Sequence, residues 1–192
     1  ALLAEKGFDS SIEIFEGKRG FSRIYSTTTD LDKLTAKLGE DWMITRNGYK
    51  PHACGVVQHP MIDAMIALAR NHDIAPESIN SVHLKLHPGV IRITGVENPE
   101  NGLKSKFSLT HSAAVGYLDR TAGVRQYSNE RASSPDVISL RNKITAEGDD
   151  SLRKDEAKAT IKTTDGKRFE HHIPHAAGTV DNPMSDSEMK AK

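Results

Sequence analysis

The sequence has a single cysteine, no excess charge of either sign and no long hydrophobic run. Because Cys54 stands alone among 192 residues, neither an intrachain disulfide nor a four-thiolate zinc or iron–sulfur site can form. The 26 Lys and Arg balance the 26 Asp and Glu, so no global charge attracts nucleic acid or an anionic membrane. No apolar run approaches the length of a bilayer span. We therefore expect no nucleic-acid or membrane partner, and the lone cysteine favours a reducing, cytoplasmic compartment.

The chain has the size of one ordinary domain, and both of its ends have the pattern of interrupted helices. A hydrophobic content of 36% is enough for a core. Residues 1–6 are typical of the last turns of a helix that stops at Gly7. Ser185 can cap a second helix, with Glu188 as its capping-box partner. These ends indicate an excerpt from a longer protein.

Three periodic patterns predict the main elements of the interior. Apolar residues recur on one helical face after Pro60, which suits the first helical position and makes His59 the predicted N-cap. Residues 79–87 alternate between apolar and polar, as in a half-buried strand. Residues 157–163 and 167–173 alternate in the same way, and Asp165-Gly166 between them predicts an antiparallel hairpin with a two-residue turn.

Weaker patterns add further elements. Together with the three above, they predict a mixed α+β fold with about as much helix as strand, in which the strands come late in the chain and are antiparallel. Residues 108–119 predict a helix rich in small side chains, which lets it lie close to a neighbour. Further helices are expected over residues 30–38 and from Ser134, carried on to Ile144. Short β-like pieces fall within residues 12–26, 42–45 and 90–94.

Two basic, histidine-bearing segments each precede a predicted helix. Lys50, Gly55 and His59 precede the first helix, whose N-terminus attracts carboxylates and phosphates. Lys106 and Ser108 precede the second helix, and His111 falls in its first turn. Taken singly, each segment is better explained by solvated lysines, a capping residue and a surface histidine. Two cationic helix starts in one domain, however, can converge on one polyanion.

Histidine clusters elsewhere give weaker signals for a metal. His83 and His87 share one face of a predicted strand but lie too far apart along it to chelate one ion easily. His171, His172 and His175 have a spacing that suggests zinc, yet neighbours in a strand point to opposite faces, so at most two can converge. We expect a solvated hairpin there and no metal site.

Three segments together resemble the MmgE/PrpD family, which includes 2-methylcitrate dehydratase, cis-aconitate decarboxylase and iminodisuccinate epimerase. Residues 50–64, KPHACGVVQHPMIDA, are similar to the family pattern Lys-Pro-Tyr-Pro-Cys-Cys-x-x-x-His-Pro-x-Ile-Asp-Ala. Residues 102–114 and the later Leu118-Asp119 pair follow a second family pattern. The tail, from Asp165-Gly166 to residues 182–186, fits the third. His52, Ala53 and Gly55 depart from the first pattern, which blurs the subfamily.

The resemblance implies a two-domain enzyme of which this chain is mostly the smaller α+β lid domain. Residues 8–180 would form the lid, while residues 1–7 and 181–192 would belong to an all-helical domain that lies mainly upstream in the same chain. A homodimer without cofactor or metal is implied, with an active site between the domains. By position, Lys50 and His111 are the implied catalytic residues. The expected substrate-binding residues are Gly55, His59, Lys106 and Ser108.

The implied activity is that of a lyase on a small di- or tricarboxylic acid, foremost the dehydration of 2-methylcitrate. Dehydration removes a proton next to a carboxylate, which requires a cationic clamp and a positioned acid/base pair. A buried lysine can have its pKa lowered enough to transfer protons. Epimerisation or decarboxylation of a related acid passes through a similar carbanion-like centre and stays an alternative. A module that binds anionic metabolites without turnover is the alternative from another class.

Overall fold

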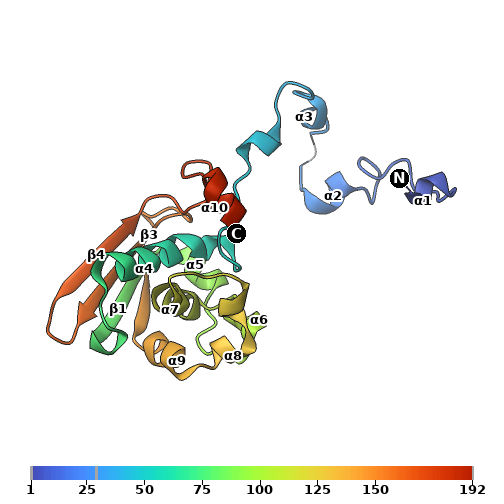
Figure 1. The fold of residues 1–192 in the computed structure, drawn as a ribbon. Coiled ribbons are helices and arrows are strands. Elements are labelled where there is room, and N and C mark those ends of the chain that lie inside the picture. Colours follow the sequence, from blue (N-terminus) through green and yellow to red (C-terminus); the bar gives the residue numbers. More distant parts are fainter. Residues whose placement is uncertain (1, 29, 192) are drawn as a thin grey trace. The chain divides into compact units, whose positions relative to one another are not determined.

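The computed structural model describes residues 2–28 and 30–191, without the side chain of residue 34, as two compact units, Ala1–Arg46 and Asn47–Lys192 (Figure 1). Predictions that involve Ala1, Leu34 or Lys192 lie outside this description. In the part of the chain that is described, no helix has both the length and the apolarity to cross a membrane. The domain boundaries expected after residues 7 and 180 stay predictions.

The first unit contains only short helices and turns. Its helix α1 ends as expected, because Gly7 has a φ of 80° and Phe8 N–H closes the end on the Leu3 carbonyl. The β-like pieces predicted within residues 12–26 and 42–45 are wrong. A strand needs a paired neighbour, whereas turn bonds such as Gly20 N–H to the Gly17 carbonyl satisfy this backbone locally. The elements are α1 (Leu2–Glu5), α2 (Phe21–Tyr25), α3 (Asp32–Thr35) and the 3₁₀-helix η1 (Met43–Arg46).

The second unit is built on a four-stranded sheet with the order β2-β1-β3-β4. The strands are β1 (Ile79–Leu86), β2 (Ile144–Gly148), β3 (Ala157–Thr163) and β4 (Arg168–Ile173). The predicted strand over residues 79–87 and the hairpin are therefore confirmed. The antiparallel expectation is incomplete, because β1 pairs antiparallel with β3 but parallel with β2. The sequence prediction missed β2, since Ile144 was placed on the preceding helix.

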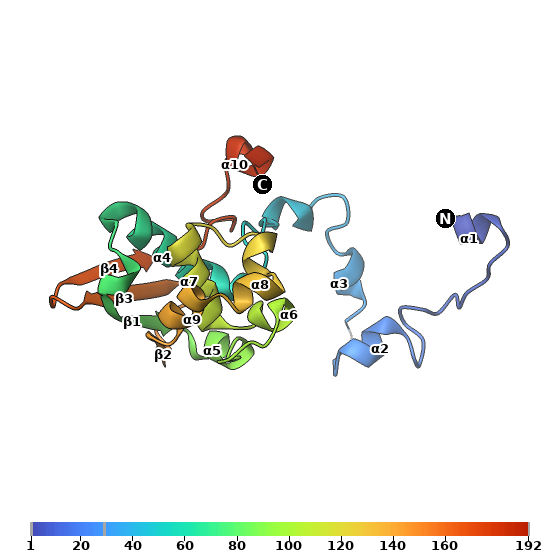
Figure 2. The same ribbon diagram turned by 60° about the horizontal axis from the view of Figure 1, so that its bottom comes forward.

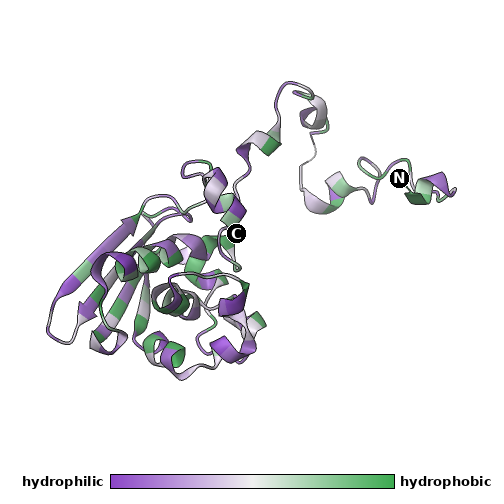
Figure 3. Ribbon diagram, viewed as in Figure 1, coloured by the Kyte–Doolittle hydropathy of each residue, from purple (hydrophilic) through white to green (hydrophobic). Residues whose placement is uncertain are grey.

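A layer of helices covers one face of this sheet (Figures 1 and 2). Helix α4 (His59–His72) packs against β3 and β4, and α7 (Leu109–Asp119) packs between α4 and α9 (Pro135–Arg141). Green apolar and purple polar residues mix along α4 in Figure 3. The apolar face is buried against alternate strand residues, as in any two-layer α+β domain. The fully buried residues of the core between this helix and the sheet include Met61, Ile62, Met65, Leu68, Val82, Leu84, Leu86 and Ile161.

Helices α4 and α7 touch closely at Gly116. A Cβ added there would lie 3.3 Å from Ile62 Cγ2 and 3.4 Å from the Ile62 carbonyl oxygen. The expectation that small residues bring this helix close to a neighbour is thus confirmed.

Local capping overrides β-like composition at residues 90–94, where the predicted strand is wrong. Pro88 opens helix α5 (Pro88–Ile93), and His87 Nδ1 accepts a 2.9 Å hydrogen bond from Gly89 N–H. At the other end of the chain, the predicted capping box is confirmed by the Ser185 N–H to Glu188 Oε2 bond of 2.8 Å. The remaining elements are η2 (Val56–Gln58), η3 (Pro76–Ser78), α6 (Gly102–Ser105), η4 (Val124–Tyr127), α8 (Asn129–Ala132) and α10 (Asp186–Ala191).

The hairpin between β3 and β4 has a three-residue loop rather than the predicted two-residue turn. Thr163 N–H donates to the Lys167 carbonyl at 3.0 Å, which leaves residues 164–166 in the loop. Gly166 alone has a positive φ, 84°, whereas a type I′ turn would require one at Asp165 as well.

Replacing Gly166 by valine should destabilise the fold by about 1–2 kcal/mol, because a branched side chain is strained at positive φ. Nothing lies within 4 Å of a Cβ added there, so the effect would come from the backbone alone. Gly166→Asn is the matched control, since asparagine tolerates this conformation. Denaturant unfolding of the two variants measures the difference, and equal midpoints would refute the loop geometry.

Candidate active site

Three of the predicted site residues lie together around one open pocket of about 610 Å³. Lys50 and Gly55 come from the segment before α4, and Lys106 comes from the segment before α7. The two predicted cationic helix starts therefore do converge. The other lining residues are Pro51, His52, Ala53, Cys54, Phe107, Gly123 and Val124.

Buried polar contacts bring these segments together. The fully buried Gln58, which precedes α4, donates from Nε2 to the Lys106 carbonyl at 2.6 Å. Ala53 N–H donates to the Ala122 carbonyl at 2.9 Å, which joins the first segment to the loop after α7. Sequence periodicity contains no information on either contact, since both join residues far apart in the chain.

The tail of the domain holds the backbone next to Lys50. Tyr49 N–H donates to the Gly178 carbonyl at 2.7 Å, and Gly178 has a φ of 83°. A Cβ added at Gly178 would lie 1.9 Å from the Tyr49 carbonyl oxygen, so no other residue fits there without movement of the chain. The position of Lys50 thus depends on a loop that follows the last strand.

His52, which was not among the predicted site residues, lines the same pocket. Its Nε2 lies 2.8 Å from Asp63 Oδ1, and the other oxygen of this carboxylate accepts a 2.8 Å bond from Ala177 N–H. A histidine held by a partly buried carboxylate has a fixed orientation and tautomer, which suits proton transfer. The sequence did contain a signal for this residue. His52 stands where the family pattern has a tyrosine, and Asp63 follows eleven residues later.

His59 lies behind the pocket and does not line it. The predicted N-cap role is wrong, because Gln58 is the N-cap and His59 is the first residue of α4. The His59 ring is 1% exposed, meets the His52 ring edge-on at 5.0 Å and has no partner for Nε2 among the described residues. Burial lowers the pKa of His59 to about 4, and the neighbouring His52 adds to this effect.

His111 and Ser108 also lie behind the pocket wall. Ser108 is the N-cap of α7 as expected, and its Oγ accepts from His111 N–H at 3.3 Å. The His111 ring is fully buried, with Nε2 2.8 Å from the Gln126 carbonyl oxygen. Burial lowers the pKa of His111, so the ring is held neutral. Neither side chain reaches the space between Lys50 and Lys106 in this conformation.

Cys54 connects the pocket to a small buried hydroxyl pair. Tyr127 Oη and Ser112 Oγ lie 3.0 Å apart, and Tyr127 packs on the His111 ring at 5.5 Å. Burial raises the pKa of the Cys54 thiol. The thiol is therefore protonated at neutral pH and behaves as a small core residue rather than as a nucleophile.

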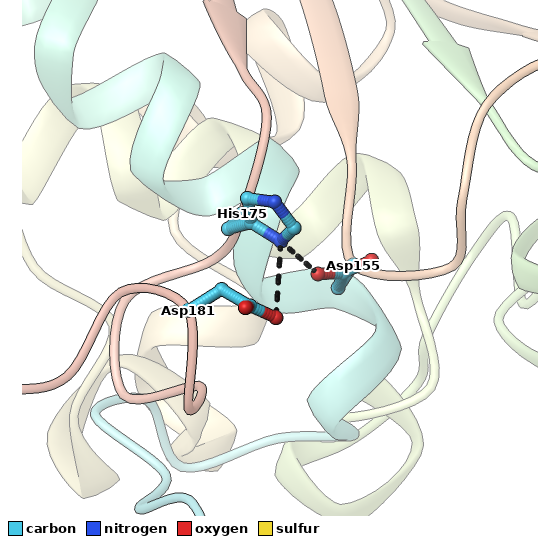
Figure 4. Close-up of side chains that lie close together, drawn as sticks. All are labelled: Asp155, His175 and Asp181. Atoms are coloured by element: carbon cyan, nitrogen blue, oxygen red, sulfur yellow. Dashed lines mark hydrogen bonds and ion pairs between the residues drawn. The ribbon is translucent and has the colours of Figure 1, made fainter.

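The histidines near the hairpin separate, as the alternation predicts. His172 Nε2 lies 2.8 Å from Glu156 Oε1, whereas His175 Nδ1 lies 2.8 Å from Asp155 Oδ2 and 3.7 Å from Asp181 Oδ2 (Figure 4). Asp155, His175 and Asp181 have possible metal-ligand atoms within 4.8 Å of one another. Arg153 approaches the same group at 3.3 Å from His175 Nε2, and this positive charge disfavours a cation. The group is explained by its own ion pairs.

Acidification should weaken folding through His59. Because the pKa of His59 is about 4 in the fold and about 6.5 in the unfolded chain, the unfolded state binds more protons between these values. The free energy of unfolding should therefore fall by up to about 3 kcal/mol as pH drops from 6.5 to 4. His59→Phe should flatten this dependence, measured by denaturant titration, whereas exposed His72→Gln should not. An unchanged slope in His59→Phe would contradict the assignment.

Comparison with known proteins supports the family that the residue patterns indicate. The family model of the MmgE/PrpD C-terminal domain matches residues 52–192, well over half of the chain. Lys50 lies just ahead of the matched range. No curated protein matches the chain. The family is generally enzymatic, of the lyase or dehydratase type. The chain therefore belongs to the MmgE/PrpD family, and residues 52–192 are its C-terminal domain.

Proposed function

We propose that this chain is part of a lyase that acts on a small di- or tricarboxylic acid, and that its reaction is the dehydration of 2-methylcitrate. The observation that supports the proposal is the meeting of Lys50 and Lys106 at one pocket. No carboxylate is found among the described residues that line it, and each of the two ammonium groups in this lining carries a positive charge. Two carboxylates of one substrate would match this charge.

The pocket wall supports a dehydration chemically. Phe107 and Val124 add apolar surface to the lining beside the two lysines. Lys106 and the backbone of Gly55 would hold the substrate, while Lys50 and the carboxylate-held His52 stand ready for proton transfer. The carbanion-like charge that develops next to the carboxylate would be stabilised by the same ammonium groups.

His59, Ser108 and His111 would support this site from behind. Ser108 fixes the start of α7, and the neutral rings of His59 and His111 fill the wall below the lining residues. The resemblance assigns His111 a catalytic role. We keep that role as part of the proposal, and it requires the His111 ring to reach the substrate after a change of the pocket wall.

Further catalytic groups would come from an all-helical domain of the same chain, and the whole enzyme would be a cytoplasmic homodimer without a cofactor. The helical domain, the homodimer and the lack of a cofactor rest on the resemblance, and the cytoplasmic location rests on the lone Cys54. An epimerase or decarboxylase of a related dicarboxylic acid would use the same cationic clamp and the same proton-transfer groups. A module that binds polycarboxylates without turnover would need the clamp alone.

The reaction can be identified by proton NMR of the full-length protein in deuterated water. The protein is incubated separately with 2-methylcitrate, cis-aconitate and an imino-dicarboxylate. We expect loss of 2-methylcitrate with formation of its dehydrated product. Deuterium incorporation without net loss would instead identify an epimerase, and consumption of cis-aconitate a decarboxylase. No change in any of the three acids would contradict the enzyme proposal and favour the binding module.

Lys50→Ala in the full-length protein should lower turnover by about 10²–10⁴-fold, the usual range for an acid/base group. The melting temperature should stay nearly unchanged, because the Lys50 side chain is exposed. Lys104→Ala is the matched control: Lys104 lies two residues from Lys106 but pairs with Glu100 at 2.7 Å, away from the pocket lining. Equal turnover in the two variants would remove Lys50 from the proposed site.

A further inference from the structure

Arg141 carries a buried guanidinium that forms no ion pair with any of the described residues. It is the last residue of α9 and is 8% exposed. Its Nε and Nη1 are sealed from solvent without a hydrogen-bond partner among the described residues, and none of its nitrogens takes part in a described ion pair. Arginine stays charged in proteins. A buried, unpaired charge is costly, so such groups are normally paired.

The guanidinium lies at a second pocket, of about 450 Å³, which shares no lining residue with the Lys50 pocket. Its walls come from the loop after α5, the first turn of α7 and the start of the edge strand β2. The first turn of α7 adds the partial positive charge of a helix N-terminus. The apolar part of the wall consists of Ile91, Val96, Leu109, Ile144 and Ala146.

We propose that this pocket binds a small aliphatic monocarboxylate, whose carboxylate pairs with Arg141 and whose hydrocarbon tail lies on the apolar wall. One buried cation matches one negative charge, whereas a polyanion would leave charge unpaired. The part of the guanidinium that lines the pocket can donate a charge-assisted hydrogen bond to a carboxylate. This site is independent of the function proposed for the Lys50 pocket.

Among the described residues that line this pocket, Glu97 is the carboxylate that would compete with such a ligand. It lines the same pocket, but its residue is exposed and no ion pair joins it to Arg141 in the described structure. Arg141 Nε and Nη1 are sealed and Glu97 is exposed, so a small anion would meet Arg141 on the side that lines the pocket. The experiment must therefore separate an external ligand from Glu97.

The test is calorimetric titration of the full-length protein with butyrate at constant ionic strength, with neutral butyramide and inorganic phosphate as comparison ligands. We expect saturable binding of butyrate. Arg141→Met should weaken this binding about 10–100-fold, the loss expected for charge-assisted hydrogen bonds. Exposed Arg70→Met and the pocket variant Lys50→Ala should leave it unchanged. Because Lys50→Ala tests turnover separately, loss of the proposed enzyme activity would not affect this measurement.

The melting temperature gives a second readout that does not require the variant to bind. Butyrate should raise the melting temperature of the wild-type protein but not that of Arg141→Met. Absence of wild-type binding, equal binding in Arg141→Met, or equal affinity for butyramide or phosphate would each overturn the proposal. Binding that appears only in Glu97→Gln would show Glu97 to be the internal partner of Arg141, and would overturn it as well.

Discussion

The close contact between Gly116 of α7 and Ile62 of α4 is the constraint on which the arrangement of the domain depends. With no side chain at Gly116, the two helices approach until Ile62 touches the α7 backbone. Both helices can then cover one face of the same sheet, α4 over β3 and β4 and α7 beside β2. The segments before the two helices become neighbours, and the bond from Gln58 to the Lys106 carbonyl fixes their spacing. The charge of the pocket is thus a result of helix packing.

Beneath the pocket the domain contains more buried polar groups than a simple core requires. His59, His111 and Gln58 are sealed from solvent, and each has at least one polar atom without a partner among the described residues. A core built for stability alone would satisfy or replace such groups. Departures of this kind concentrate at functional sites, where a particular environment is more useful than maximal stability. Burial lowers the pKa of both His59 and His111, so these two imidazoles add no positive charge beneath the lysines.

Local patterns predicted the elements that combine strong periodicity with clear end signals. Helix α4 has an apolar face and an early Pro60, and the β3–β4 hairpin has alternation and Gly166, so both were predicted. Residues 90–94 have β-branched composition but follow Pro88 and the capping side chain of His87, and the cap prevailed. Strand β2 was missed because five residues are too few for a distinct pattern, and its partner β1 lies far away in the sequence.

The candidate site was chosen from sequence signals of the same local kind, and the roles of its residues stay predictions. Spacing and family resemblance selected Lys50, Gly55 and Lys106, which do share a pocket. They could not show that His59 and His111 lie behind the wall, because burial is decided by contacts with distant residues such as Gln126. Arg141 gave no signal at all, since an arginine at a helix end is ordinary until its partners are known.

The hydrogen bond from Tyr49 N–H to the Gly178 carbonyl positions the backbone next to Lys50 without contributing to the hydrophobic core. The sheet and the α4–α7 layer draw their buried side chains from residues before Gly178, whereas the backbone beside Lys50 is held in place by that glycine and the loop around it. A change in this loop would leave the hydrophobic core intact but would no longer hold the backbone beside Lys50 in place. Substitutions in this loop can therefore alter the position of Lys50 although Gly178 belongs neither to the lining of the Lys50 pocket nor to the hydrophobic core.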